Sequence, residues 1–203
     1  MLPPILSHIR GLGLEVYTSG DYNLNLFGIR SSDTSSGTFN DLLGCAYKAD
    51  NQWHVRYWAA TCDPGIYYRE NPMNVKGTAI LMPGQYKSVY KIDGHGRTKY
   101  KALCQRNGSV RVWRDNDRNS ELDHGVAQDE GWHGINLHAS SVRPYEEDRD
   151  RDPDTSSVNR WSAGCQVHAT TTGFREMMSL AHKQIEVHPN WEPAFTYTLV
   201  DEF

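Results

Sequence analysis

The chain lacks the features that mark several large classes of protein. Cysteine is scarce, with 4 in 203 residues, and the spacing of these cysteines matches no zinc-ligand pattern. No stretch approaches the roughly 20 apolar residues of a membrane-spanning helix, so membrane insertion is not expected. Positive charge is not in excess, because 21 Lys and Arg face 25 Asp and Glu, giving a net charge of −4. This balance disfavours nucleic acid as a partner.

The first ten residues also lack the basic start, apolar stretch and small-residue cleavage site of a secretion signal. Without an export signal, the cysteines are expected to be reduced thiols. The chain is therefore expected to be made in the cytoplasm of its host cell.

What the sequence does contain is aromatic residues and short runs that are typical of β-strands. There are 6 Trp, 11 Tyr and 5 Phe, and turn signals such as Asp63-Pro64-Gly65 separate the apolar runs. Strands are predicted at 53–60, 77–82, 86–92, 100–105, 110–114 and 195–200, and a helix is predicted after the capping threonines 170–172. The predicted fold is mainly β with one or two helices (α+β). Residues 1–50 are expected to form an N-terminal arm or hairpin of unknown role, with a polar loop at 31–38, and 51–203 the main domain.

Two segments of the main domain carry residues suited to nucleophilic chemistry. Cys165 follows the turn Ser162-Ala163-Gly164, and His138 ends the apolar run Ile135-Asn136-Leu137. A thiol nucleophile needs a base beside the sulfur and backbone N–H groups facing the developing oxyanion. On a regular strand His133 faces away from His138, and His168 faces away from Cys165, so both are poor partners for this pair.

The order of these segments resembles the signature of the L,D-transpeptidase (YkuD-like) catalytic domain, most of all its divergent phage and prophage members. That family has an apolar strand ending in His, then Ser-His-Gly-Cys-Ile/Val-Arg and a polar turn into a helix. The resemblance covers about residues 53–186 and implies an L,D-transpeptidase-like β-sandwich or barrel. It implies that Cys165 is the nucleophile and His138 the general base, that Gly164 and Cys165 donate to the oxyanion, and that Ser162 orients the pair.

The sequence departs from the family pattern at two positions that matter for substrate contacts. The second His of the family is Ala163 here, and the Arg two residues after the nucleophile is Val167. The resemblance implies a peptidoglycan stem peptide as substrate, attacked to give a thioacyl-enzyme, with no cofactor and no metal. A phage-encoded hydrolase (endolysin-like) that reaches the cell wall in the periplasm at lysis or entry is the favoured reading. Transpeptidation between diaminopimelate residues, or a catalytically silent wall-binding or virion structural protein, are the alternatives.

Two residue patterns raise the alternative of a metal site. The alternating residues Asp148, Asp150, Asp152 and Asp154 are spaced like the start of a calcium loop, but the interleaved arginines favour a solvated loop. A zinc site built from His124, His133, His138 and an Asp has no HExxH-type spacing to support it.

Overall fold

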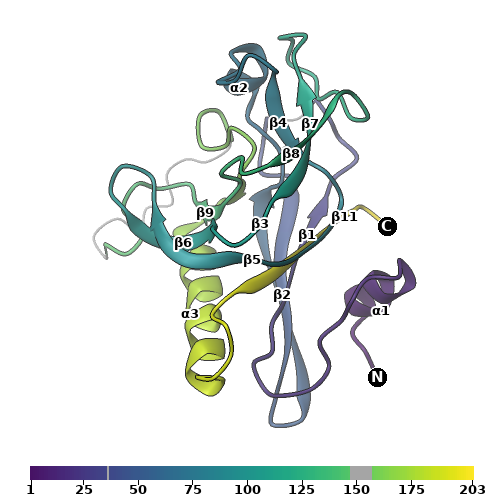
Figure 1. Ribbon diagram of the computed structural model, residues 1–203, viewed down its shortest axis with the longest axis vertical. Coiled ribbons are helices and arrows are strands. Elements are labelled where there is room, and N and C mark those ends of the chain that lie inside the picture. Colours follow the sequence, from purple (N-terminus) through teal and green to yellow (C-terminus); the bar gives the residue numbers. More distant parts are fainter. Residues whose placement is uncertain (36, 147–156) are drawn as a thin grey trace.

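The computed structural model describes residues 1–35, 37–146 and 157–203 (Figure 1). The elements in chain order are α1 (Pro4–Gly11), β1 (Asn25–Arg30), β2 (Asp41–Ala49), β3 (Gln52–Thr61), α2 (Ile66–Glu70), β4 (Thr78–Leu81), β5 (Gly84–His95), β6 (Tyr100–Gln105), β7 (Val110–Asp115), β8 (Gln128–Gly131), β9 (Leu137–Ala139), β10 (Gln166–His168), α3 (Thr171–Val187) and β11 (Phe195–Asp201). The prediction of a mainly β fold with helices is confirmed, although the described residues contain three helices where one or two were expected.

Most of the strands close into one barrel. Its order is β1-β11-β5-β6-β9-β10-β3-β2, and β4, β7 and β8 form a separate 3-stranded sheet. Figure 1 shows this small sheet together with α2 at one end of the molecule, and α3 lying beside the barrel. A closed barrel leaves no unpaired edge strand, and its inward-facing side chains fill the interior.

The boundary expected between residues 50 and 51 falls inside the barrel. β2 and β3 pair antiparallel from Asp41↔Ala60 to Ala49↔Gln52, so Asp50 and Asn51 are the two residues of a hairpin turn. Both have positive φ angles, 51° and 60°, as a tight primed turn requires. β1 pairs in parallel with the C-terminal strand β11. β1 and β2 are therefore strands of the same barrel as β3, β5, β6, β9, β10 and β11.

The first 20 residues, part of the expected N-terminal arm or hairpin, include the helix α1. Pro residues at the first positions of α1 suit a helix start, and Ile5, Leu6 and Ile9 share its buried face. That face packs against Phe27 and Val200 in a small second core. The burial of this apolar face holds α1 against β1 and β11.

The C-terminal helix and strand follow the sequence prediction. The Thr170 side chain accepts a hydrogen bond from the Gly173 amide (3.0 Å) and so caps the N-terminus of α3. Phe174, Met177, Met178 and Ala181 are buried in the main core, as their helical spacing predicts. None of the helices in the described residues has the length and apolar character needed to cross a bilayer.

An ion pair lies inside the barrel near the end of β1. Arg30 is 1% exposed, and its Nε lies 2.9 Å from Asp63 Oδ1. The Arg30 Nη2 atom also donates to the carbonyl oxygens of Leu81 (2.8 Å) and Cys62 (3.3 Å). The guanidinium thereby links β1 to the end of β4 and to the segment after β3, both of which lead to the candidate site.

We expect Arg30→Met to lower the free energy of unfolding by about 3–5 kcal/mol, because the buried Asp63 carboxylate loses its cation. Urea denaturation measures this change. Arg56→Met is the control, because the Arg56–Glu176 pair is about half exposed and its loss should cost less than about 1 kcal/mol. Equal destabilisation by the two variants would contradict a structural role for the buried pair.

Candidate active site

The parallel pairing of β9 with β10 brings the two predicted catalytic segments together. Gln166 lies opposite Leu137 and Val167 opposite His138, and the Gln166 amide donates to the carbonyl oxygen of Asn136 (2.9 Å). Cys165, directly before β10, therefore lies next to Asn136 and close to His138. His138 and Cys165 line the same cavity of about 420 Å³. No hydrogen bond joins these two described residues, so they are neighbours across the cavity and not a bonded pair.

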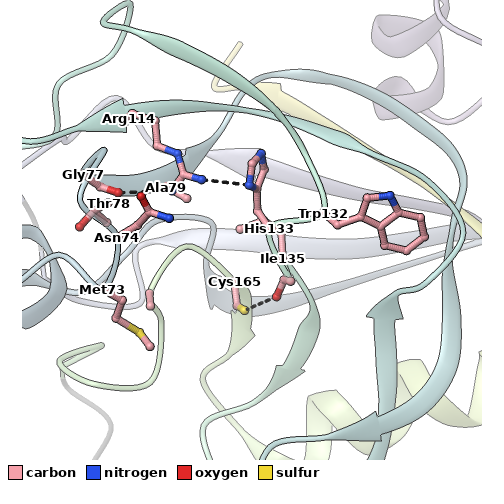
Figure 2. A pocket seen from close by; sticks show the side chains of 12 residues that line it. Met73, Asn74, Gly77, Thr78, Ala79, Arg114, Trp132, His133, Ile135 and Cys165 are labelled. Carbon is pink, nitrogen blue, oxygen red and sulfur yellow. Dashed lines mark hydrogen bonds between the residues drawn. The ribbon is translucent and has the colours of Figure 1, made fainter.

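The Cys165 sulfur is held between two backbone groups. Its thiol donates to the Gly134 carbonyl oxygen (3.4 Å; Figure 2), and the Asn136 amide donates to the sulfur (3.4 Å). Burial raises the pKa of the Cys165 thiol to about 11, and the Asn136 N–H opposes this shift only in part. The resting sulfur is thus a thiol at neutral pH.

His138 is a neutral imidazole with a defined tautomer. It is 4% exposed, and its Nδ1 donates to the carbonyl oxygen of Ala139 (2.9 Å). The proton therefore lies on Nδ1, which leaves the Nε2 lone pair to accept a proton. Burial, and secondarily the neighbouring His95, lowers the pKa of His138 to about 3. The group stays unprotonated at neutral pH, as a general base must.

His95, which no sequence pattern marks, lies against His138. The two rings stack with centroids 4.1 Å apart and planes 21° apart. The Asn136 side-chain amide donates to His95 Nδ1 (3.1 Å), and burial lowers the pKa of His95 to about 4. The strand predicted at 86–92 continues to His95 as β5. No local signal places residue 95 beside residue 138, since the contact depends on how β5, β6 and β9 pair.

Ser162 and Gly164 shape the turn that presents the cysteine. The Ser162 hydroxyl donates to the Cys165 carbonyl oxygen (2.7 Å) and accepts from the Gly164 amide (3.1 Å). Gly164 has φ +126°, and a Cβ there would lie 2.5 Å from the Ala79 carbonyl oxygen, so only glycine fits. The Gly164 N–H already donates to Ser162, so it is not free to donate to an oxyanion as expected. The Cys165 amide remains as the backbone donor beside the sulfur.

The side chain of Gln105 organises the segment before β9. Its Oε1 accepts from the amides of His133 (3.2 Å), Gly134 (2.9 Å) and Ile135 (3.1 Å). Its Nε2 donates to the carbonyl oxygens of Gly108 (3.0 Å) and Gly131 (2.9 Å). Nothing in the sequence marked this glutamine, which the structure buries fully at the end of β6.

Neither His133 nor His168 is hydrogen-bonded to Cys165 or His138 in the described residues. His133 Nδ1 bonds to Arg114 Nη2 (2.9 Å), and His168 is buried in the core with its Nε2 3.2 Å from the Met177 sulfur. His124 stacks on Trp113. Among the described residues, no group of three or more metal-ligating side chains includes a histidine. The aspartates 148–154 lie outside the described residues.

A second cavity of about 390 Å³ reaches the cysteine from another side (Figure 2). Its lining includes Ala79, Arg114, Trp132 and His133. The Arg114 guanidinium is held in place by Asp129 (3.1 Å) and by the Gly77 carbonyl oxygen (3.3 Å). The half-buried sulfur therefore lies where two cavities meet, one with the neutral imidazole and one with a fixed cation.

Removal of the Gln105 side-chain amide should destabilise the fold. We expect Gln105→Leu to lower the free energy of unfolding by about 3 kcal/mol, because several buried backbone groups lose their partners. Denaturant titration measures the change. Gln52→Leu, at an exposed position of β3, is the matched control and should change stability little. A similar effect of both variants would argue against the proposed role of Gln105.

The pH dependence of thiol reactivity tests the state of the sulfur. Because only the thiolate reacts and the pKa of Cys165 is raised to about 11, alkylation by iodoacetamide should accelerate about tenfold per pH unit from pH 7 to 9. Mass spectrometry of the labelled peptide measures the rate. Cys165→Ser is the control, because Cys45, Cys62 and Cys104 are buried. A rate that is already constant at pH 6 to 7 would show a preformed thiolate and contradict this description.

Comparison of the chain with protein-family models, with curated proteins and with solved structures finds no match. The function of the site has therefore to be inferred from its own residues and geometry.

Proposed function

We propose that the protein is a cysteine-dependent acyl-transfer enzyme of L,D-transpeptidase type that acts on peptidoglycan stem peptides. The observation that carries the proposal is the shared cavity of Cys165 and His138, in which the imidazole is neutral and its Nε2 is available. The motif order around these residues supports the family assignment, and the closed barrel is compatible with an L,D-transpeptidase-like fold.

In the proposed reaction the Cys165 sulfur attacks the carbonyl carbon of the substrate amide. The thiol proton passes to His138 Nε2 as the carbon–sulfur bond forms, since neither group is ionised beforehand. The Cys165 amide donates to the oxyanion. When the tetrahedral intermediate collapses, the leaving amine takes the proton from His138 and a thioacyl-enzyme remains. Water, deprotonated by His138, then attacks the thioester and releases the acid and the thiol.

The charge of the first cavity suits an acidic peptide. Arg97 and Arg160 line it together with Tyr68, Tyr100 and Trp161. Arg160 lies over the Tyr67 ring at 3.9 Å, which limits the orientations of its guanidinium. Stem peptides carry carboxylates, and guanidinium groups bind carboxylates in a bidentate geometry. These two arginines are positioned to take the role of the family's arginine, which is Val167 here.

Hydrolysis is favoured over transfer in this proposal, and an analysis of the reaction products separates the two. Purified sacculi are digested with the wild type and with Cys165→Ala, and the products are identified by mass. The wild type should release D-Ala or opened cross-bridges, and Cys165→Ala should be at least about a thousandfold slower. His138→Gln should lose about 10²–10⁴-fold. New links between diaminopimelate residues would instead indicate transpeptidation.

Cys45→Ala is the control variant, because it replaces a buried thiol that faces neither cavity. It should retain the wild-type product pattern. Identical products from wild type and Cys165→Ala would contradict the proposal and favour a catalytically silent wall-binding or virion structural protein.

A further inference from the structure

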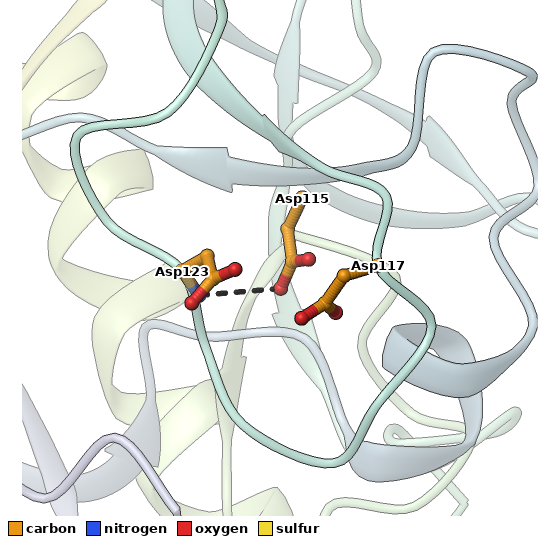
Figure 3. Close-up of side chains that lie close together, drawn as sticks. All are labelled: Asp115, Asp117 and Asp123. Carbon is orange, nitrogen blue, oxygen red and sulfur yellow. Dashed lines mark hydrogen bonds between the residues drawn. The ribbon is translucent and has the colours of Figure 1, made fainter.

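The loop between β7 and β8 carries oxygen-bearing side chains at alternate positions. Asp115 ends β7 and is followed by Asp117, Asn119, Glu121 and Asp123. Carboxylate oxygens of Asp115, Asp117 and Asp123 all lie within 4.8 Å of one another. Figure 3 shows the three carboxylate groups facing a common point enclosed by the loop.

The buried member of this cluster has an oxygen without a partner. Asp115 is 2% exposed, and its Oδ2 accepts from the Asp123 amide (3.3 Å). Its Oδ1 is buried and has no hydrogen-bond partner among the described residues. A buried carboxylate oxygen without a donor is costly and rare in native proteins. Figure 3 shows the Asp115 carboxylate facing the other two carboxylates, so a positive ligand at their centre would lie beside it.

Asp115 interacts electrostatically with the buried Arg69, but no cation forms an ion pair with the cluster in the described residues. Within the described part of the chain, no ion pair includes Asp115, Asp117 or Asp123. Carboxylates this close repel one another unless a proton or a cation lies between them.

We propose that this loop binds a divalent cation of the calcium type, with the carboxylates of Asp115, Asp117 and Asp123 as ligands. All three donors are oxygens, and neither a histidine nor a cysteine belongs to the cluster, which favours a hard cation over zinc. The loop is not an EF-hand, because Ser120 occupies the position of the EF-hand glycine and Val126 that of the terminal glutamate. The site was not expected from the sequence, which predicted no metal.

The loop is already ordered for such a ligand. The backbone amide of Asn119 donates to Asp117 Oδ1 (3.1 Å), and the backbone amide of Glu121 donates to Asn119 Oδ1 (2.6 Å). The buried Arg69 donates through Nη1 to the Ser120 carbonyl oxygen (2.8 Å) and so fixes the loop to α2. Asp115 directly follows Arg114, which lines the second cavity. Cation binding therefore stabilises the strand end that carries this arginine.

Calorimetric titration of the full-length protein, first treated with EDTA, with CaCl₂ and separately with MgCl₂ tests the proposal. The wild type should bind one Ca²⁺ per chain, more tightly than Mg²⁺. Calcium at about 100 times its Kd should raise the melting temperature by about 5 °C. Asp117→Asn, at an exposed position, should fold normally and weaken calcium binding at least tenfold. Asp50→Asn, in the β2–β3 turn, is the control and should bind as the wild type does.

Two results would overturn the proposal. One is the absence of saturable calcium binding and of any change in melting temperature up to 10 mM CaCl₂. The other is equal calcium binding by Asp117→Asn and Asp50→Asn, which would place any bound ion elsewhere. Both readouts are independent of enzymatic activity, so they do not depend on the function proposed for Cys165.

Discussion

The arrangement around the cysteine depends on one buried amide, the side chain of Gln105. It accepts from three successive backbone amides before β9 and donates to two carbonyl oxygens. This clamp fixes the Gly134 carbonyl group, to which the Cys165 thiol donates, and the Gln105 backbone amide binds the Asn136 side chain. Asn136 in turn holds His95 against His138. The sulfur, the base and the ring behind the base are therefore positioned by one set of connected hydrogen bonds.

Burial determines the chemistry that this site can perform. It raises the pKa of Cys165 and lowers the pKa of His138, so the resting pair is a neutral thiol and a neutral imidazole. Such a pair differs from a thiolate–imidazolium ion pair, which reacts readily with any electrophile. In the proposed reaction proton transfer accompanies attack on a bound substrate, which makes the alignment of the substrate the main requirement. Arg97, Arg114 and Arg160 line the two cavities, and in the proposed reaction they align an acidic peptide.

Local sequence patterns predicted the elements that depend on local physics. The α3 cap at Thr170, its apolar face and the strands from β3 to β7 all follow from short-range propensity and periodicity. The contacts of Gln105 and His95 could not be predicted, because they form only when distant strands pair. The same limit explains why the boundary at residue 50 has no counterpart, since β1 pairs with the C-terminal strand β11. The carboxylate cluster was hidden for a related reason: alternating acidic residues occur both at 115–123 and at 148–154, and no local pattern marks Asp115 as buried.

Detection of the covalent intermediate tests the central claim most directly. The protein is mixed with a purified peptidoglycan tetrapeptide, quenched in acid within milliseconds to seconds, and analysed by intact-mass and peptide mass spectrometry. The account predicts an increase equal to the acyl part of the tetrapeptide after loss of D-Ala, on the peptide that contains Cys165. Release of D-Ala by Cys165→Ala at the wild-type rate, with no adduct at any time, would contradict it.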